Sequence, residues 1–117
     1  MTFKLEQELD GTAEPTLEEL LEAVMDWGQA RGITINGNPQ TQCLKLGSEY
    51  GELCDNIAKG RYEAAKDDIG DMLVVLLMIT ALIDTDISEC LGVAFEDIKD
   101  RTGYLTKDGI FVKEGDE

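Results

Sequence analysis

The chain has 117 residues, of which 43% are hydrophobic, and its 25 acidic against 10 basic residues give a net charge of −15. This length suits one compact domain and leaves no room for a second independent core. The negative charge repels nucleic-acid backbones and anionic membrane surfaces, so we expect neither as a partner. A small anionic substrate is still compatible with this charge if bound cations reverse its sign locally.

Cysteine and histidine usage narrows the possible metal chemistry. Histidine is absent, and the three cysteines, at positions 43, 54 and 90, have no short paired spacing. This inventory argues against a zinc site and against the di-iron sites of helical bundles, and it leaves magnesium, or manganese, bound by oxygen ligands. The odd cysteine count and an N-terminus that lacks the regions of a signal peptide predict a cytoplasmic protein.

The first helix is predicted to follow a loosely held arm. Residues 1–15 are polar and show no periodic pattern, so we expect an arm there. Thr16 and Glu19 fit a capping box, in which each side chain binds the backbone of the other residue. Apolar residues then keep helical spacing as far as Gly32, which should stop the helix.

The second and third helices are predicted next along the chain. Asn38 followed by Pro39 is typical of a helix start, and this helix should end near Gly60. A third helix is predicted over residues 63–83. Its second half, residues 72–83, is apolar except for one threonine, so we expect it to be buried nearly all round. That run is shorter than the roughly 20 residues that a membrane-spanning helix needs.

A fourth helix and a tail complete the predicted organisation. Asp86 suits the N-cap of the fourth helix. The residues expected on its inner face are Ile87, Leu91, Ala94, Phe95 and Ile98. Asp108 and Gly109 lie in the middle of residues 104–112 and predict either a hairpin turn or an extended tail. We therefore expect an arm (1–15), an all-α domain built as a four-helix bundle (16–103) and a short C-terminal tail (104–117).

The candidate site consists of four acidic residues, two on each of two predicted helices: Glu49, Glu52, Asp68 and Asp71. The members of each pair are three residues apart, so they lie on one face of their helix. Two such pairs can converge across packed helices, where unneutralised carboxylates beside an apolar core are costly. The pattern predicts a divalent-metal site. The alternative is an ordinary solvated acidic face, which is common in a protein with this charge.

Four further residues are candidate substrate contacts. At about 100° per residue, Lys45 and Asn56 share an arc of roughly 60° with the two glutamates of the second helix. Lys45 either binds a phosphate or pairs with Glu49, four residues on. Trp27 either stacks on a nucleobase or packs in the core. Arg101 either closes over the ligand or interacts with the dipole at the C-terminus of its helix.

Two stretches resemble a known family. The segments KLGSEYGEL, residues 45–53, and DDIGDMLVVL, residues 67–76, resemble the E-x-x-E and E-x-x-D signature of MazG-like nucleotide pyrophosphohydrolases. Residues 27–42 and 98–113 resemble the small, often phage-encoded members of that family. The resemblance implies an all-α bundle that forms dimers or tetramers, with the active site near a subunit interface. It also implies magnesium-dependent hydrolysis of a nucleoside or deoxynucleoside triphosphate to the monophosphate and pyrophosphate.

Carried over residue by residue, the resemblance places the metal-binding acids of the family on Glu49, Glu52 and Asp71. Asp68 stands where the family usually has glutamate, and Ser48 replaces a frequent glutamate. The sequence supports no Ser-His or Cys-His nucleophile, so water should attack, with Glu49 or Glu52 as its base. Two alternatives stay open: a non-enzymatic acidic protein such as a DNA mimic, and an inactive relative that only binds nucleotides.

Overall fold

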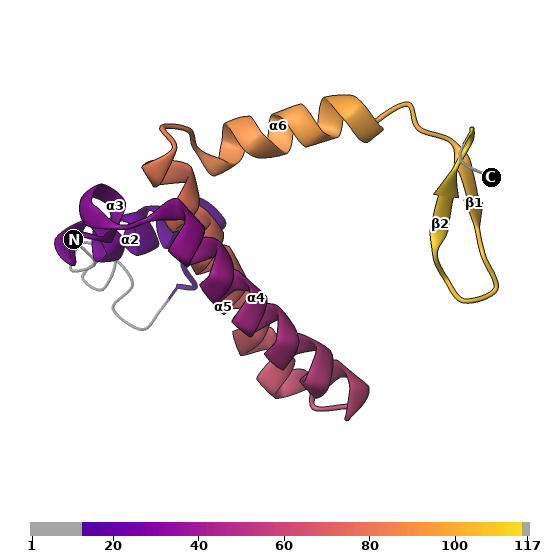
Figure 1. The fold of residues 1–117 in the computed structure, drawn as a ribbon, viewed down its shortest axis with the longest axis horizontal. Coiled ribbons are helices and arrows are strands. Elements are labelled where there is room, and N and C mark those ends of the chain that lie inside the picture. The colour runs from indigo at the N-terminus through magenta and orange to yellow at the C-terminus, as the bar shows by residue number, and fades with distance from the viewer. Residues whose placement is uncertain (1–12, 116–117) are drawn as a thin grey trace. The chain divides into compact units, whose positions relative to one another are not determined.

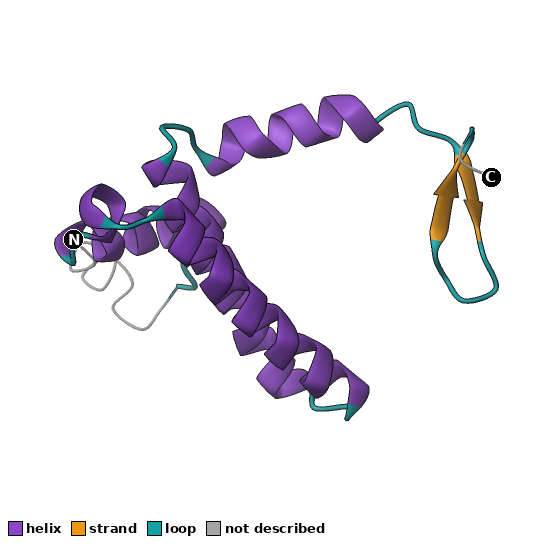
Figure 2. Ribbon diagram, viewed as in Figure 1, coloured by secondary structure: helices purple, strands orange, loops and turns teal. Residues whose placement is uncertain are grey.

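The structure is a computed structural model in which residues 13–115 are described (Figure 1). Helices dominate this part of the chain and a single pair of short strands follows them (Figure 2). The elements are α2 (Leu17–Ala30), α3 (Ile33–Asn36), α4 (Pro39–Ala58), α5 (Tyr62–Leu82), α6 (Ile87–Ile98), β1 (Gly103–Leu105) and β2 (Phe111–Lys113). The predicted helical class is confirmed. Residues 1–12 of the predicted arm lie outside the described part.

Local sequence signals set the ends of the helices. At the start of α2, the backbone N–H of Glu19 donates to Oγ1 of Thr16 over 3.1 Å, and the backbone N–H of Thr16 donates to Oε1 of Glu19 over 2.8 Å, which confirms the capping box. At the start of α4, Oδ1 of Asn38 accepts from the backbone N–H of Thr41 over 3.0 Å. The single-turn helix α3, which follows Gly32 at a φ of 77°, was not predicted.

Helices α4 and α5 form an antiparallel pair, because only residues 59–61 connect them (Figure 1). Helices α2 and α3 also contact α5. Gly28 lets α2 approach α5 closely, since a Cβ at this position would collide with Sδ of Met78. The buried apolar residues of the described part all belong to α5: Ala65, Val75, Leu77 and Met78. Helix α5 is therefore the centre of this core.

The prediction that residues 72–83 are buried nearly all round is wrong for the single chain. Leu76 and Ile83 are exposed, as is Ile69 one turn before this segment. The helices α2, α3 and α4 cover the other sides of α5 and leave this side open. The segment thus has more apolar surface than the helices packed against it cover.

The C-terminal residues, from Ile87 onward, form a second compact unit. Of the two alternatives expected for residues 104–112, the structure shows the hairpin: β1 and β2 pair antiparallel, with Tyr104 opposite Val112, and Gly109 adopts a φ of 84° in the turn. The predicted inner face of α6 is not covered within this unit, since every residue of α6 after Ile87 is exposed. The structure thus shows a helical protein without showing the predicted four-helix bundle. None of the described helices combines the length and the apolar character needed to cross a membrane.

Candidate metal centre

Three of the four predicted acidic residues come together between α4 and α5. Glu49 on α4 and Asp68 and Asp71 on α5 each offer a carboxylate oxygen, and these oxygens all lie within 4.8 Å of one another. Asp68 is 5% exposed, and Glu49 and Asp71 are half-buried. The convergence follows from the antiparallel pairing, which places the contact faces of the two helices against each other.

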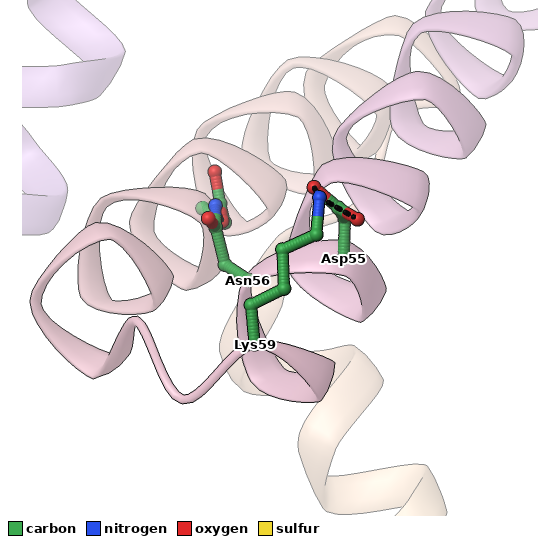
Figure 3. Close-up of polar contacts among 4 residues, drawn as sticks. Asp55, Asn56 and Lys59 are labelled. Atoms are coloured by element: carbon green, nitrogen blue, oxygen red, sulfur yellow. Dashed lines mark hydrogen bonds and ion pairs between the residues drawn. The ribbon is translucent and has the colours of Figure 1, made fainter.

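Asn56 holds one of these carboxylates in place. Its side-chain amide Nδ2 donates a hydrogen bond of 2.6 Å to Oδ2 of Asp68 across the two helices. Figure 3 shows Asn56 directed away from the ion pair that Asp55 and Lys59 form on the same helix. The predicted contact of Asn56 with substrate stays a prediction, and the structure shows its amide bound to Asp68. It therefore acts as a positioning residue for a buried acid.

Glu49 has an oxygen that the described residues leave without a partner. Its Oε2 is buried and accepts no hydrogen bond from them. Burial raises the pKa of this carboxyl, the negative charges of Glu52, Asp71 and Asp68 raise it further, and Lys45 opposes them. A buried carboxylate oxygen without a donor, surrounded by other acids, is an arrangement that a cation would stabilise.

The donor set fits a hard divalent cation. All three candidate ligands supply oxygen, the donor atom that magnesium and manganese prefer. Magnesium binds oxygen at about 2.0–2.1 Å in an octahedron, so its ligand oxygens lie roughly 2.9–4.2 Å apart. The three oxygens lie within 4.8 Å of one another and would move closer together to bind one such ion. Water or a substrate phosphate would fill the remaining positions.

Glu52 and Lys45 lie at the edge of this acidic group. Glu52 is exposed and is not among the three residues with converging oxygens, although its charge still raises the pKa of Glu49. Glu49 and Glu52 are three residues apart, so their side chains lie about 60° apart around α4. Glu49 is on the side that faces α5, and Glu52 points further away from α5. Lys45 is exposed one turn before Glu49 and lowers the pKa of that residue.

An apolar groove adjoins the acidic group. It has a volume of about 380 Å³, and Trp27 and Asp71 both line it, together with Leu20, Ala23, Val24 and Val74. Trp27 keeps 38% of its surface exposed, so it is not a buried core residue. The guanidinium of Arg31 lies 4.7 Å from the centroid of its ring and donates a 3.1 Å hydrogen bond to its carbonyl oxygen. The carboxylate of Asp71 thus belongs to both the candidate metal site and the groove.

Two arginines remain to be placed, Arg101 and Arg31. Arg101 belongs to the second unit, where it pairs with Asp97 over 2.8 Å, so its predicted substrate contact stays a prediction. Arg31 was not singled out from the sequence, although its position four residues after Trp27 places the two on one helix face.

Comparison with known proteins gives a partial match. The chain is 36% identical over 63 residues to a protein of Haemophilus phage HP1 described as an uncharacterized 18.2 kDa protein in the rep-hol intergenic region. The match covers 54% of this chain and 39% of that protein, so the chain corresponds to well under half of its relative. No family model matches the chain, and no solved structure matches it.

Proposed function

We propose that this protein is a magnesium-dependent nucleoside triphosphate pyrophosphohydrolase, which cleaves a nucleoside or deoxynucleoside triphosphate into the monophosphate and pyrophosphate. The observation that carries the proposal is the group of Glu49, Asp68 and Asp71, in which a buried oxygen of Glu49 has no partner among the described residues. The resemblance of residues 45–53 and 67–76 to MazG-like enzymes supplies the reaction class.

The groove supports a nucleotide as the substrate. A triphosphate needs cations, which the acidic group would hold, and a nucleobase needs a flat apolar surface. The exposed ring of Trp27 offers such a surface in a groove that Asp71 also lines. The volume of about 380 Å³ is in the range of small-molecule sites. A solvated acidic face would not need an adjoining apolar groove.

Each residue near the site then has a role. Glu49, Asp68 and Asp71 would hold the cation, and Asn56 fixes the orientation of Asp68. The bound cation would lower the pKa of water and neutralise charge on the phosphates. Glu52, exposed beside Glu49, would accept the proton of the attacking water, and Lys45 would contact a phosphate. Manganese would be an alternative to magnesium, because it also accepts oxygen ligands.

Cleavage is proposed at the α-phosphorus rather than the γ-phosphorus. The sequence contains no G-x-x-x-x-G-K-[ST] loop, the usual element that holds the terminal phosphates for transfer. Pyrophosphate that keeps its bound cations is a well-neutralised leaving group. The choice of bond comes mainly from the family resemblance.

A product analysis tests the proposal. Canonical and modified triphosphates are incubated with the protein and magnesium, and the products are separated by ion-exchange chromatography and followed by phosphorus NMR. We expect monophosphate and pyrophosphate to appear together. Glu49→Gln and Asp71→Asn should each lower turnover by a factor of about 100 or more. Glu22→Gln, at an exposed position of α2, is the matched control and should retain turnover.

Four results would contradict all or part of the proposal. Diphosphate and orthophosphate as first products would show that the γ-phosphate is released, and not pyrophosphate. Unchanged turnover in Glu49→Gln would place the reaction elsewhere. Nucleotide binding without turnover would favour the inactive relative, and neither binding nor turnover would favour a non-enzymatic acidic protein.

A further inference from the structure

Arg31 is the cation nearest along the chain to the groove tryptophan. It is the C-cap residue of α2, and the 14 residues of that helix include no lysine or arginine. Side chains on a helix point toward its N-terminus, so a residue at the C-terminal end of α2 reaches back over the preceding turn. Trp27 lies on that turn, four residues before Arg31.

Two contacts join Arg31 to Trp27. The guanidinium lies over the indole ring, 4.7 Å from its centroid, and it donates a hydrogen bond of 3.1 Å to the carbonyl oxygen of the same residue. One contact is to the ring and the other is to the backbone that carries the ring. A tryptophan that keeps 38% of its surface exposed would otherwise have several rotamers open to it. Arg31 therefore restricts the orientation of the Trp27 ring.

The guanidinium and the groove meet different parts of the indole ring. The groove is lined on α2 by Leu20, Ala23, Val24 and Trp27, whereas Arg31 is not among its lining residues. The other three residues precede Trp27 along the helix, and Arg31 follows it. The cation thus covers ring surface outside the groove and leaves the groove side of the ring free. A flat ligand in the groove would stack on that free side.

A capping role accounts for part of this arrangement. A cation at the C-terminal end of a helix is stabilising, and the last carbonyl oxygens of a helix need donors from outside it. The hydrogen bond from Arg31 to the carbonyl of Trp27 is such a contact. Capping does not require the guanidinium to lie over an aromatic ring. Its position on the one aromatic side chain of the groove is the observation that capping leaves unexplained.

We propose that Arg31 is a positioning residue for the substrate, because it holds the Trp27 ring so that one face meets the nucleobase in the groove. Asp71 lines the same groove and belongs to the acidic group, so the ring orientation would also direct the phosphates toward the cation. This inference rests on the proposed function, since it requires a nucleotide in the groove. It assigns Arg31 no contact with the phosphates or with the metal.

Nucleoside binding tests the inference without metal and without turnover. Trp27 is the single tryptophan of the chain, so its fluorescence reports the ring directly. Adenosine, guanosine, cytidine, uridine and thymidine are titrated in turn into the metal-free protein. At least one nucleoside should quench the fluorescence in a saturable way. Arg31→Met should raise its Kd by about two- to five-fold, the usual effect of an exposed cation–π contact. Arg31→Lys keeps the charge without the planar fork and should give an intermediate Kd.

Steady-state kinetics with the corresponding triphosphates and magnesium gives the second readout. Arg31→Met should raise KM by the same factor and change kcat by less than about two-fold, because the lost contact acts equally on the bound substrate and the transition state. Arg61→Met is the matched control. Arg61 is an exposed arginine at the start of α5, and the variant should keep the wild-type KM and nucleoside affinity. Circular dichroism should show wild-type helix content in all variants.

The outcomes separate this inference from the proposed hydrolase activity. Nucleoside affinity and KM that Arg31→Met leaves unchanged would overturn the inference alone, as would a fall in kcat at constant KM, which would place Arg31 at the reacting phosphates. Wild-type fluorescence that no nucleoside changes would also overturn it, whether or not triphosphates are hydrolysed. A wild type that binds nucleosides in an Arg31-dependent way but hydrolyses no triphosphate would uphold the inference and overturn the proposed activity.

Discussion

Glu49 is the acid whose ionisation the folded structure disfavours. Burial and three neighbouring acids raise its pKa, and its Oε2 has no partner among the described residues. A raised pKa means that the folded state holds this proton more tightly than the unfolded state does. The associated stabilisation is present at acidic pH, and it is lost as the pH rises through the folded-state pKa.

Glu49→Gln should therefore change the pH dependence of stability in the metal-free protein. We expect the variant to be more stable than the wild type at neutral pH and to lose less stability between acidic and neutral pH, because glutamine cannot ionise. Chemical unfolding across this pH range, after removal of metal by dialysis, measures the difference. Glu22→Gln is the control and should follow the wild type. A steeper pH dependence in Glu49→Gln would contradict the environment assigned to this residue.

Asn56 makes a second residue-scale effect testable. Its amide donates a hydrogen bond to the 5% exposed Asp68, so Asn56→Leu would leave a buried carboxylate without that donor. We expect the metal-free variant to be destabilised by about 1–3 kcal/mol and to bind magnesium more weakly by a factor of about 10–100. Urea unfolding and calorimetric titration measure the two effects. Asn36→Leu, at an exposed position of the short helix α3, serves as the control.

At the scale of elements, the helix ends depend on local chemistry. Asn38→Ala removes the acceptor for the backbone N–H of Thr41 and should lower the free energy of unfolding by about 1 kcal/mol. Urea unfolding followed by circular dichroism measures this change. Ser48→Ala, at an exposed position inside α4, should be neutral or slightly stabilising, since alanine favours the helix interior. An equal loss in both variants would argue against capping as the cause.

The elements also differ in how far the described chain covers them. Helix α5 contacts three other helices and contains all the buried apolar residues of the described part. Helix α6 has 12 residues, and its own unit leaves every residue after the first exposed. Isolated helices of about 12–15 residues are only marginally stable in water, so packing against the apolar side chains that its own unit leaves exposed would stabilise α6.

At the scale of the whole molecule, the acidic group links metal binding to folding. Magnesium or manganese should raise the melting temperature of the wild type, because the three acids converge only in the folded chain. A cation at 100 times its Kd would add about 2.7 kcal/mol to the free energy of unfolding. Calorimetric melts with magnesium and with chelator measure the shift, and Glu49→Gln should reduce it strongly. The same shift in both proteins would place the bound metal elsewhere.

The sequence by itself determined the four longer helices, although not the single-turn helix α3, and it offered the hairpin as one of two alternatives for residues 104–112. Capping residues, the proline at the start of α4 and apolar periodicity act within a few residues, so Thr16, Asn38 and the turn at Gly109 were predictable. The sequence also predicted that the two acids of each pair lie on one face of their helix, because residues three apart are separated by about one helix turn. Local patterns, however, fix only the rotation of a side chain about its own helix.

Only the tertiary structure decided which side chains meet. The contact between α4 and α5 brings Glu49 to Asp68 and Asp71, leaves Glu52 exposed at the edge, and directs Asn56 to Asp68. It likewise left Leu76 exposed in a segment, residues 72–83, that was expected to be buried nearly all round. Both outcomes depend on the relative rotation and register of two packed helices, which packing over the whole interface sets and which a single helical pattern does not contain.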